Sequence, residues 1–176
     1  PEDEAILLPY FNEEAPEDFA LVLAPHEIHE EHLRAIESGL KRPSIRLSEY
    51  DEAKGLPEGT ACIIIDCFGL LSSVYRYGSW AYVGGGFGKS VHNTLEAAVY
   101  GIPVFFGPEI RKHREVRELV KRSSGFILHD RAELSQLLQR FSSEEECKAL
   151  EARTRAYFSE ECGATAAILS DILPSE

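Results

Sequence analysis

The residues with the clearest chemical potential lie in one glycine-rich segment, GGGFGKSVHNTLEAA at positions 84–98. Glycine leaves backbone N–H groups uncovered, and N–H groups that precede a helix favour a bound phosphate. Lys89 adds a positive charge, while Asn93 and Glu96 follow where we expect the helix to begin. These residue types in this order predict a phosphate or nucleotide site.

Two common phosphate-binding motifs do not account for this segment. The letters GKS at 88–90 match the end of the P-loop pattern G-x-x-x-x-G-K-[ST], but Val83 stands where its first glycine is required. The dinucleotide pattern G-x-G-x-x-G fails in both possible frames, because Lys89 or Val91 occupies the third glycine position. Neither an NAD or FAD site nor a true P-loop is therefore indicated.

The predicted helix after the loop offers a third interpretation. Asn93 or Ser90 can cap its first turn, and the Glu96 carboxylate can accept hydrogen bonds from both hydroxyls of a ribose. Structural explanations stay open beside this one, since Asn93 is a good cap whatever the ligand and Glu96 has the spacing of an ordinary surface carboxylate. His92 lies beside Asn93, but nothing in the sequence orients it as a base.

The elements that must position these residues alternate between strands and helices. Apolar or β-branched runs predict strands at 19–24, 44–47, 61–66, 80–83, 103–106 and 125–128. Helical spacing and capping residues predict helices at 1–12, 29–39, 69–75, 92–100, 113–122, 131–141, 144–158 and 164–173. The alternation predicts an α/β fold, a Rossmann-like doubly wound parallel sheet covered on both faces. No linker or repeat divides the chain, so we expect a single domain over residues 1–176.

Ligands of a doubly wound sheet bind at the carboxyl ends of its strands. Pro25 and His26 follow one predicted strand, Asp66 ends another, and Gly84–Gly86 follow a third. We expect these positions to converge in space. Two of them also have structural explanations, since His26 can satisfy a carbonyl at the strand end and Asp66 can cap the turn at 68–69.

Composition and charge narrow the possible partners. The 176 residues are 44% hydrophobic and 27% charged, as in ordinary globular domains, and the formal net charge is -12. A nucleic-acid surface needs clustered Lys and Arg, so we expect no nucleic-acid partner, although a single nucleotide needs only one local site.

No apolar run is long enough to cross a membrane, so we expect a soluble domain. The chain starts at Pro1 within a helix-like pattern, which suggests a piece of a longer protein.

Cysteine and histidine spacing indicates neither disulfides nor a metal site. The four cysteines contain no C-x-x-C pair, and Cys62 and Cys67 flank an apolar run. We therefore expect reduced thiols in or near the core, and a cytosolic compartment. His29 and His32 lie at i and i+3, but no third ligand has a fixed spacing to them and there is no H-E-x-x-H motif. No bound metal is expected.

One family resemblance covers nearly the whole chain. The string GGGFGKSVHNTLEAAVYGIPVFFGP at 84–108 resembles the donor-binding signature of bacterial 3-deoxy-D-manno-octulosonic acid (Kdo) transferases, which reads roughly GG-x-F-…-HN-x-LE-x-…-GIPV-x-x-GP. LAPHEI at 23–28 and IDCFGLL at 65–71 resemble two earlier segments of that family, in the same order. The resemblance implies the C-terminal, donor-binding half of a GT-B glycosyltransferase.

The resemblance also implies a reaction and its partners. Enzymes of this family transfer Kdo from CMP-Kdo to the lipid A precursor during lipopolysaccharide biosynthesis. The N-terminal acceptor domain, the catalytic base and the membrane anchor would be missing, so we expect no catalytic residue in this chain and no cofactor besides the donor substrate. The full-length protein is expected at the cytoplasmic face of the bacterial inner membrane. The isolated chain should bind CMP weakly and transfer nothing.

The family pattern assigns nucleotide and phosphate contacts to residues of three segments. They are Pro25, His26, Phe68, Gly69, Gly84, Gly85, Gly86, Phe87, Lys89, Asn93 and Glu96. Glu96 would hold the ribose. Backbone N–H groups of 84–88 and of the helix start at 92–93 would meet the phosphate. The pairs at 25–26 and 68–69 would border the cytosine.

The chain departs from the family pattern at two places. His26 stands where the family has arginine, and the glycine loop is one residue shorter. Lys89 is the expected replacement for the missing positive charge. Two alternatives stay open, namely the half of another GT-B enzyme that binds a UDP-sugar, and a non-catalytic nucleotide-binding module.

Overall fold

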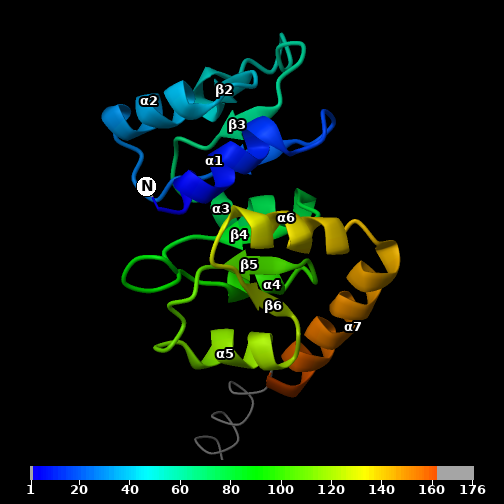
Figure 1. Cartoon of the computed structure of the whole chain (residues 1–176). Coiled ribbons are helices and arrows are strands. Elements are labelled where there is room, and N and C mark those ends of the chain that lie inside the picture. The colour runs from blue at the N-terminus through cyan, green and yellow to red at the C-terminus, as the bar shows by residue number, and fades with distance from the viewer. Residues whose placement is uncertain (1, 162–176) are drawn as a thin grey trace, which may run out of the picture. The chain divides into compact units, whose positions relative to one another are not determined.

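The computed structural model describes residues 2–161 of the chain, and Figure 1 shows them as short strands and helices. By their internal contacts these residues form two compact units. The first comprises the chain up to Val74 together with His129–Gln136, and the second comprises Tyr75–Leu128 and the chain from Leu137. The described strands pair in parallel in both units. The predicted α/β class is therefore confirmed, whereas a single domain over 1–176 stays a prediction.

The first unit is built on a three-stranded parallel sheet in the order β1-β3-β2. Its elements are α1 (Glu4–Glu13), β1 (Leu21–Leu23), α2 (Glu30–Gly39), β2 (Ser44–Arg46), the 3-10 helix η1 (Leu47–Glu49), β3 (Cys62–Ile64) and α3 (Leu71–Val74). In the central strand β3, Cys62 lies in register with Leu21 on one side and with Ser44 on the other. Helix α6 (Arg131–Arg140) starts in this unit and continues into the second.

One face of this sheet carries the core of the first unit. Alternate residues of β1 and β3 pack with Phe11 of α1 and with Leu33 and Ile36 of α2. The alternation leaves Val22 of β1 47% exposed, although the apolar run at 19–24 predicts a strand that is buried throughout. That part of the prediction is wrong, because an apolar run does not show whether both faces of a strand are covered.

The second unit contains another three-stranded parallel sheet, in the order β4-β5-β6. Its elements are the 3-10 helix η2 (Tyr75–Tyr77), β4 (Ala81–Val83), α4 (Leu95–Ala98), β5 (Val104–Phe106), α5 (Arg114–Lys121), β6 (Gly125–Ile127) and α7 (Glu144–Glu161). The central strand β5 is buried along its whole length. Val104 and Phe106 of this strand share a core with Ala98 of α4, Leu119 of α5 and Tyr157 of α7.

The helices are largely where the sequence predicts them, but their limits differ. The helix predicted at 92–100 shows the largest difference, because α4 begins only at Leu95 and has four residues. Helix α7, predicted at 144–158, continues to Glu161. The helix predicted at 164–173, and the break before it, lie outside the described residues. Within residues 2–161, no helix combines the length and the hydrophobicity that crossing a bilayer requires.

The predicted thiols differ in environment. Cys62 is fully buried in β3, and burial raises its pKa to about 12. Cys67 is exposed, so the expectation of a thiol in or near the core is correct for Cys62 and wrong for Cys67. The cysteines of the described chain are free thiols. A thiol that burial keeps protonated, as at Cys62, is a poor nucleophile.

Candidate functional site

The glycine loop follows β4 and folds back on itself. The N–H of Gly88 donates to the carbonyl of Gly85 at 3.0 Å, and the N–H of His92 donates to the carbonyl of Gly84 at 3.0 Å. A backbone N–H that already has an acceptor is not a ready donor to a ligand. In the structure these two N–H groups therefore donate to carbonyls of the loop, whereas the sequence predicted that they donate to a phosphate.

A close approach of two backbone segments holds the loop in place. A Cβ atom on Gly86 would lie 2.6 Å from the nitrogen of Gly107, so neither position has room for a side chain. Beside this contact, the N–H of Glu109 donates to the carbonyl of Gly86 at 2.8 Å. The N–H of Val91 donates to the carbonyl of Glu109 at 3.3 Å. These contacts fasten the loop after β4 to the segment that follows β5.

Gly85 is required by its backbone conformation as well as by space. Its φ of 90° lies in the left-handed region, which side chains disfavour. A Cβ atom there would collide with the carbonyl oxygen of Ser90 and would lie 3.1 Å from the ring of His92. Gly85 and Gly86 thus have a structural explanation that is independent of any ligand.

Asn93 and Glu96 contact each other where α4 begins. Asn93 Nδ2 donates to Glu96 Oε1 at 2.9 Å, and Asn93 Oδ1 accepts from the N–H of Leu95 at 3.1 Å. Asn93 therefore satisfies the N–H of the first residue of α4 from the position before the N-cap, which is Thr94 and not the predicted Asn93, and it also orients the Glu96 carboxylate. Both side chains are exposed to a ligand. Because α4 has only four residues, its dipole supports an anion less than the predicted helix would.

Tyr75 is a neighbour of Glu96 that the sequence did not indicate. Burial raises the pKa of Tyr75 to about 12, and the negative charge of Glu96 acts in the same direction. Tyr75 therefore stays a neutral phenol at physiological pH, close to an exposed carboxylate. No motif or spacing links the two positions, and only the packing of η2 near α4 brings the charge of Glu96 close enough to act on Tyr75.

Ser90 hydrogen-bonds to a histidine instead of capping α4. Its Oγ lies 2.6 Å from His113 Nε2, and His113 Nδ1 lies 3.1 Å from Glu115 Oε1. Because a carboxylate only accepts hydrogen bonds, Nδ1 carries a hydrogen, and Nε2 of the neutral ring accepts the hydrogen of Ser90. The three side chains fasten the glycine loop to the start of α5.

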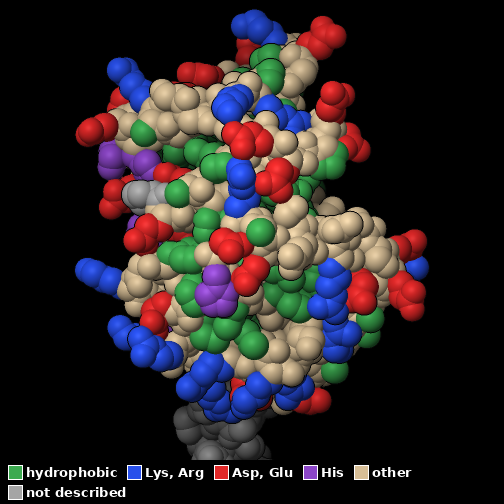
Figure 2. Space-filling model, in the orientation of Figure 1, with side chains coloured by type: hydrophobic (Ala, Val, Ile, Leu, Met, Phe, Trp, Pro, Cys, Tyr) green, Lys and Arg blue, Asp and Glu red, His purple; other side chains and the backbone are tan. Residues whose placement is uncertain are grey.

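Positive charge gathers next to the loop, although the chain as a whole is acidic. The segment 111–122, which contains α5, carries Arg111, Lys112, Arg114, Arg117, Lys121 and Arg122 against two glutamates. Figure 2 shows Lys and Arg side chains around α5, at the lower end of the view. Lys89 is exposed, and no residue of the described chain forms an ion pair with it. Local charges of this kind favour a bound anion.

The other predicted contacts lie in the first unit and follow two paired strands. Pro25 and His26 come after β1, and Phe68 and Gly69 come after β3, its parallel neighbour. The structure therefore brings these four residues to the carboxyl edge of one sheet. Phe68 is 82% exposed and His26 is exposed, whereas Pro25 is half-buried. Their convergence with the glycine loop of the second unit stays a prediction.

Asp66 has a different partner from the predicted one. Its Oδ1 accepts the N–H of Ser48 at 3.0 Å, and its Oδ2 accepts the hydroxyl of the same residue. The prediction that Asp66 caps the turn at 68–69 is wrong, because both carboxylate oxygens bind the segment that follows β2. Asp66 thus fastens η1 to the end of β3 and has a structural function.

Comparison with curated proteins identifies relatives that are named 3-deoxy-D-manno-octulosonic acid transferases. The chain is 32% identical over 134 residues to the 3-deoxy-D-manno-octulosonic acid transferase of Aquifex aeolicus, a match that covers 74% of this chain and 36% of that protein. The enzyme of the same name from Rickettsia typhi is 28% identical over 130 residues, which are 72% of this chain and 28% of that protein. The chain therefore spans roughly a third of the length of these curated relatives. No protein-family model matches the sequence.

A solved structure shares the fold. The crystal structure of the C-terminal CMP-Kdo binding domain of WaaA from Acinetobacter baumannii superposes with a TM-score of 0.74. The alignment covers 89% of this chain and 82% of that one, at 22% sequence identity. At this identity the likeness establishes the fold, which is that of the C-terminal half of a GT-B glycosyltransferase, as the sequence predicts.

We predict that Gly85→Ala destabilises the protein more than Gly59→Ala does. Both glycines have positive φ, 90° and 77°, so alanine is strained at either position by about 1–2 kcal/mol. A Cβ on Gly59 meets nothing within 4 Å, whereas a Cβ on Gly85 collides with the carbonyl of Ser90. Urea unfolding measures the two losses, with Gly59→Ala as the control. Equal losses would mean that the loop adapts to the side chain.

Proposed function

We propose that this chain, which is related in sequence to the 3-deoxy-D-manno-octulosonic acid (Kdo) transferases, binds the nucleotide-sugar donor CMP-Kdo. It would form the donor-binding part of a glycosyltransferase that passes Kdo to the lipid A precursor. The observation that carries the proposal is the contact between Asn93 and Glu96 directly after the glycine loop. The Acinetobacter domain of the same fold is named for CMP-Kdo binding, which supports this donor.

Glu96 is suited to hold the ribose of the donor. Its carboxylate is exposed, and the amide of Asn93 keeps it in one orientation. A fixed carboxylate can accept hydrogen bonds from two neighbouring hydroxyls, and each such charge-assisted bond contributes about 1.5–3 kcal/mol.

Positively charged side chains would make much of the contact with the phosphate. The N–H groups of Gly88 and His92 donate hydrogen bonds to carbonyls within the loop, and α4 is too short for a strong dipole. Lys89 is exposed in the loop, and the basic segment 111–122 begins where Ser90 and His113 join the loop to α5. Cations at these positions would stabilise a phosphate through charge-assisted hydrogen bonds.

In the first unit, we infer that Phe68 and His26 contact the cytosine base. An aromatic ring that is 82% exposed is an open stacking surface. Stacking of a base on such a ring contributes about 1–3 kcal/mol. Histidine replaces the arginine of the family pattern at position 26, and its ring can stack or hydrogen-bond to the base in place of a guanidinium.

The proposed reaction breaks the bond between the anomeric carbon of Kdo and a phosphate oxygen of CMP. Negative charge builds up on the departing CMP, and Lys89 with the glycine loop would stabilise it. The base that activates the acceptor belongs, in this proposal, to the part of the relatives that the chain does not cover. The acceptor lipid and the cytoplasmic face of the inner membrane would be contacted by that part too.

The proposal predicts a preference for cytidine nucleotides. Calorimetric titration of the 176-residue chain with CMP, UDP, ADP and NAD should show binding of CMP. The other three should bind at least about tenfold more weakly, a difference of about 1.4 kcal/mol. A preference for UDP would instead indicate an enzyme that uses a UDP-sugar. Binding of none of the four ligands would contradict the proposal.

Glu96→Gln should weaken CMP binding about tenfold or more, because it removes a charge-assisted hydrogen bond. The loss should be smaller with 2′-deoxy-CMP, which lacks one of the two ribose hydroxyls. Glu145→Gln, an exposed change in the first turn of α7, is the control and should leave both affinities unchanged. An equal loss for the two ligands would show that Glu96 does not bind the 2′-hydroxyl.

Lys89→Ala should weaken CMP binding about tenfold and leave cytidine binding unchanged, because cytidine has no phosphate. The difference should become smaller as the salt concentration rises, since Lys89 is exposed and its charge is screened. Lys54→Ala is the matched control, as Lys54 is an exposed lysine that pairs with Asp51 in the first unit. An unchanged affinity for CMP would remove Lys89 from the phosphate site.

A further inference from the structure

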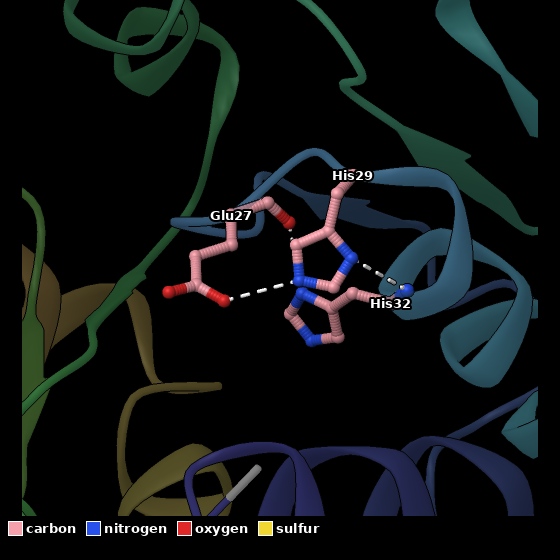
Figure 3. Close-up of side chains that lie close together, drawn as sticks. All are labelled: Glu27, His29 and His32. Atoms are coloured by element: carbon pink, nitrogen blue, oxygen red, sulfur yellow. Dashed lines mark hydrogen bonds and ion pairs between the residues drawn. The ribbon is translucent and has the colours of Figure 1, made fainter.

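We propose that Glu27, His29 and His32, assisted by Glu4, form a binding site for a divalent transition metal, Zn²⁺, in the first unit. One candidate ligand atom from each of the first three residues lies within 4.8 Å of the other two. Figure 3 shows their side chains gathered at the start of α2. The site is separate from the residues that the proposed donor site uses.

The backbone brings the three residues together at one helix start. His29 is the N-cap of α2, in extended conformation, and its Nδ1 accepts the N–H of His32 at 3.2 Å. His32 follows one turn later on the same side of the helix, and the two rings lie 5.6 Å apart between centroids. Glu27 lies before the helix, yet its Oε2 reaches His29 Nε2 at 3.2 Å. It is the third ligand that helical spacing alone does not indicate.

The hydrogen bonds of His32 leave Nε2 as the ring nitrogen without a hydrogen, which is the form that can bind a metal. Nδ1 lies 2.8 Å from the carbonyl oxygen of Glu27, which only accepts, so Nδ1 carries a hydrogen. In the neutral ring Nε2 then carries the lone pair, and a backbone anchor at the opposite nitrogen is usual for metal-binding histidines. Nε2 lies 2.7 Å from Glu4 Oε1, so two acceptors face each other. A cation must lie between them, either a proton on the ring or a metal.

Metal and protons compete at this cluster. In the apo form, Nδ1 of His29 accepts a hydrogen bond, so Nε2 carries the ring hydrogen and donates it to Glu27. When a metal binds Nε2 of His29, the ring hydrogen moves to Nδ1 and the N–H of His32 loses that acceptor. Binding also removes the extra proton of a charged His32. Affinity should therefore fall as the solution becomes acidic, because protons and the metal compete for the same ring nitrogens.

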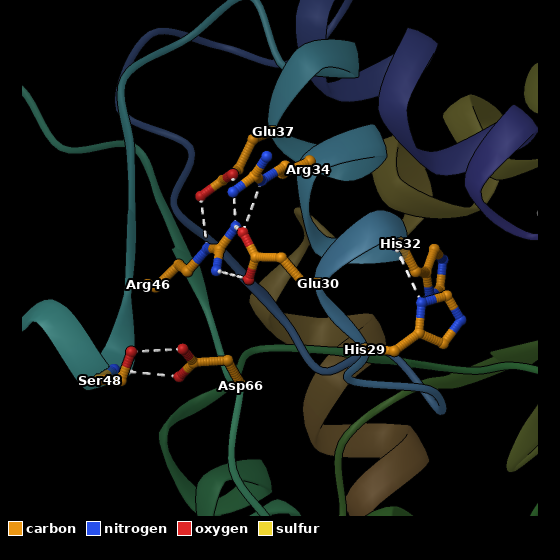
Figure 4. A network of polar contacts seen from close by, with 8 residues as sticks. All are labelled: His29, Glu30, His32, Arg34, Glu37, Arg46, Ser48 and Asp66. Carbon is orange, nitrogen blue, oxygen red and sulfur yellow. Dashed lines mark hydrogen bonds and ion pairs between the residues drawn. The ribbon is translucent and has the colours of Figure 1, made fainter.

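The ligand types and their freedom of movement suit Zn²⁺. Imidazole and carboxylate ligands at about 2.0–2.2 Å are typical of zinc, and a tetrahedral site places ligand atoms about 3.3 Å apart. The separations of up to 4.8 Å must close, which the side chains of His29 and Glu27 can do because they are 56% and 68% exposed. The neighbouring Glu30 does not compete, since Arg46 and Arg34 bind it (Figure 4).

Calorimetric titration of the 176-residue chain with ZnCl₂, without nucleotide, tests the site. At neutral pH we expect one zinc ion per chain, and at about pH 5 its affinity should fall sharply. His29→Asn keeps a side-chain oxygen for the helix cap but removes an imidazole ligand. It should weaken binding more than about tenfold, as should His32→Gln. Replacing Zn²⁺ by Co²⁺ gives absorption bands that report the coordination geometry.

His129→Asn is the matched control. His129 Nδ1 lies 3.0 Å from Glu133 Oε2, an exposed histidine–carboxylate contact outside the described His29–His32 cluster. This variant should bind zinc like the wild-type chain. Absence of zinc binding at neutral pH, or an affinity unchanged by both His29→Asn and His32→Gln, would overturn the proposal. Because His29 is exposed, its variant should remain folded, and circular dichroism checks this.

Discussion

The second unit depends on one physical constraint, the contact between the backbones of Gly86 and Gly107. Glycine at both positions lets the loop after β4 touch the segment after β5, since a Cβ on Gly86 would lie 2.6 Å from the Gly107 nitrogen. The contact allows the N–H of Glu109 to reach the carbonyl of Gly86. The segment that it fixes continues to His113, which binds Ser90. The glycine loop and the start of α5 are thereby one connected structure.

This constraint changes how the loop can hold an anion. Glycine-rich loops before helices usually offer uncovered N–H groups and the dipole of a long helix. Here the N–H groups of Gly88 and His92 stabilise the loop, and α4 has four residues. An anion at this loop would therefore interact mainly with the positive charges of Lys89 and of the basic segment 111–122. The close backbone contacts already require these glycines, so glycine alone does not prove a phosphate site.

In the first unit, the polar residues of α2 form two groups with different chemistry. Arg46 of β2 binds Glu30 and Glu37, and its guanidinium lowers the pKa of Glu30 to about 2 by hydrogen bonding (Figure 4). These carboxylates are therefore already paired with a cation. His29 and His32 face carboxylates instead, and within residues 2–161 neither of them contacts an arginine through a hydrogen bond or ion pair. One side of the helix is thus an ion-pair network, and the other presents groups that can share a metal or a proton.

Residue spacing was enough to predict the α/β class and to place Asn93 and Glu96 near the start of the helix after the glycine loop, because these depend on residues within a few positions of each other. It placed the start of α4 too early, since the N–H of His92 is drawn back to Gly84 by the folded loop. The contacts that spacing did not show are Gly86 with Gly107 and Ser90 with His113. Each joins segments that are distant in the chain and meet only when the elements pack. Periodicity describes which face of an element is apolar, and it contains no information about which distant backbone that face will touch.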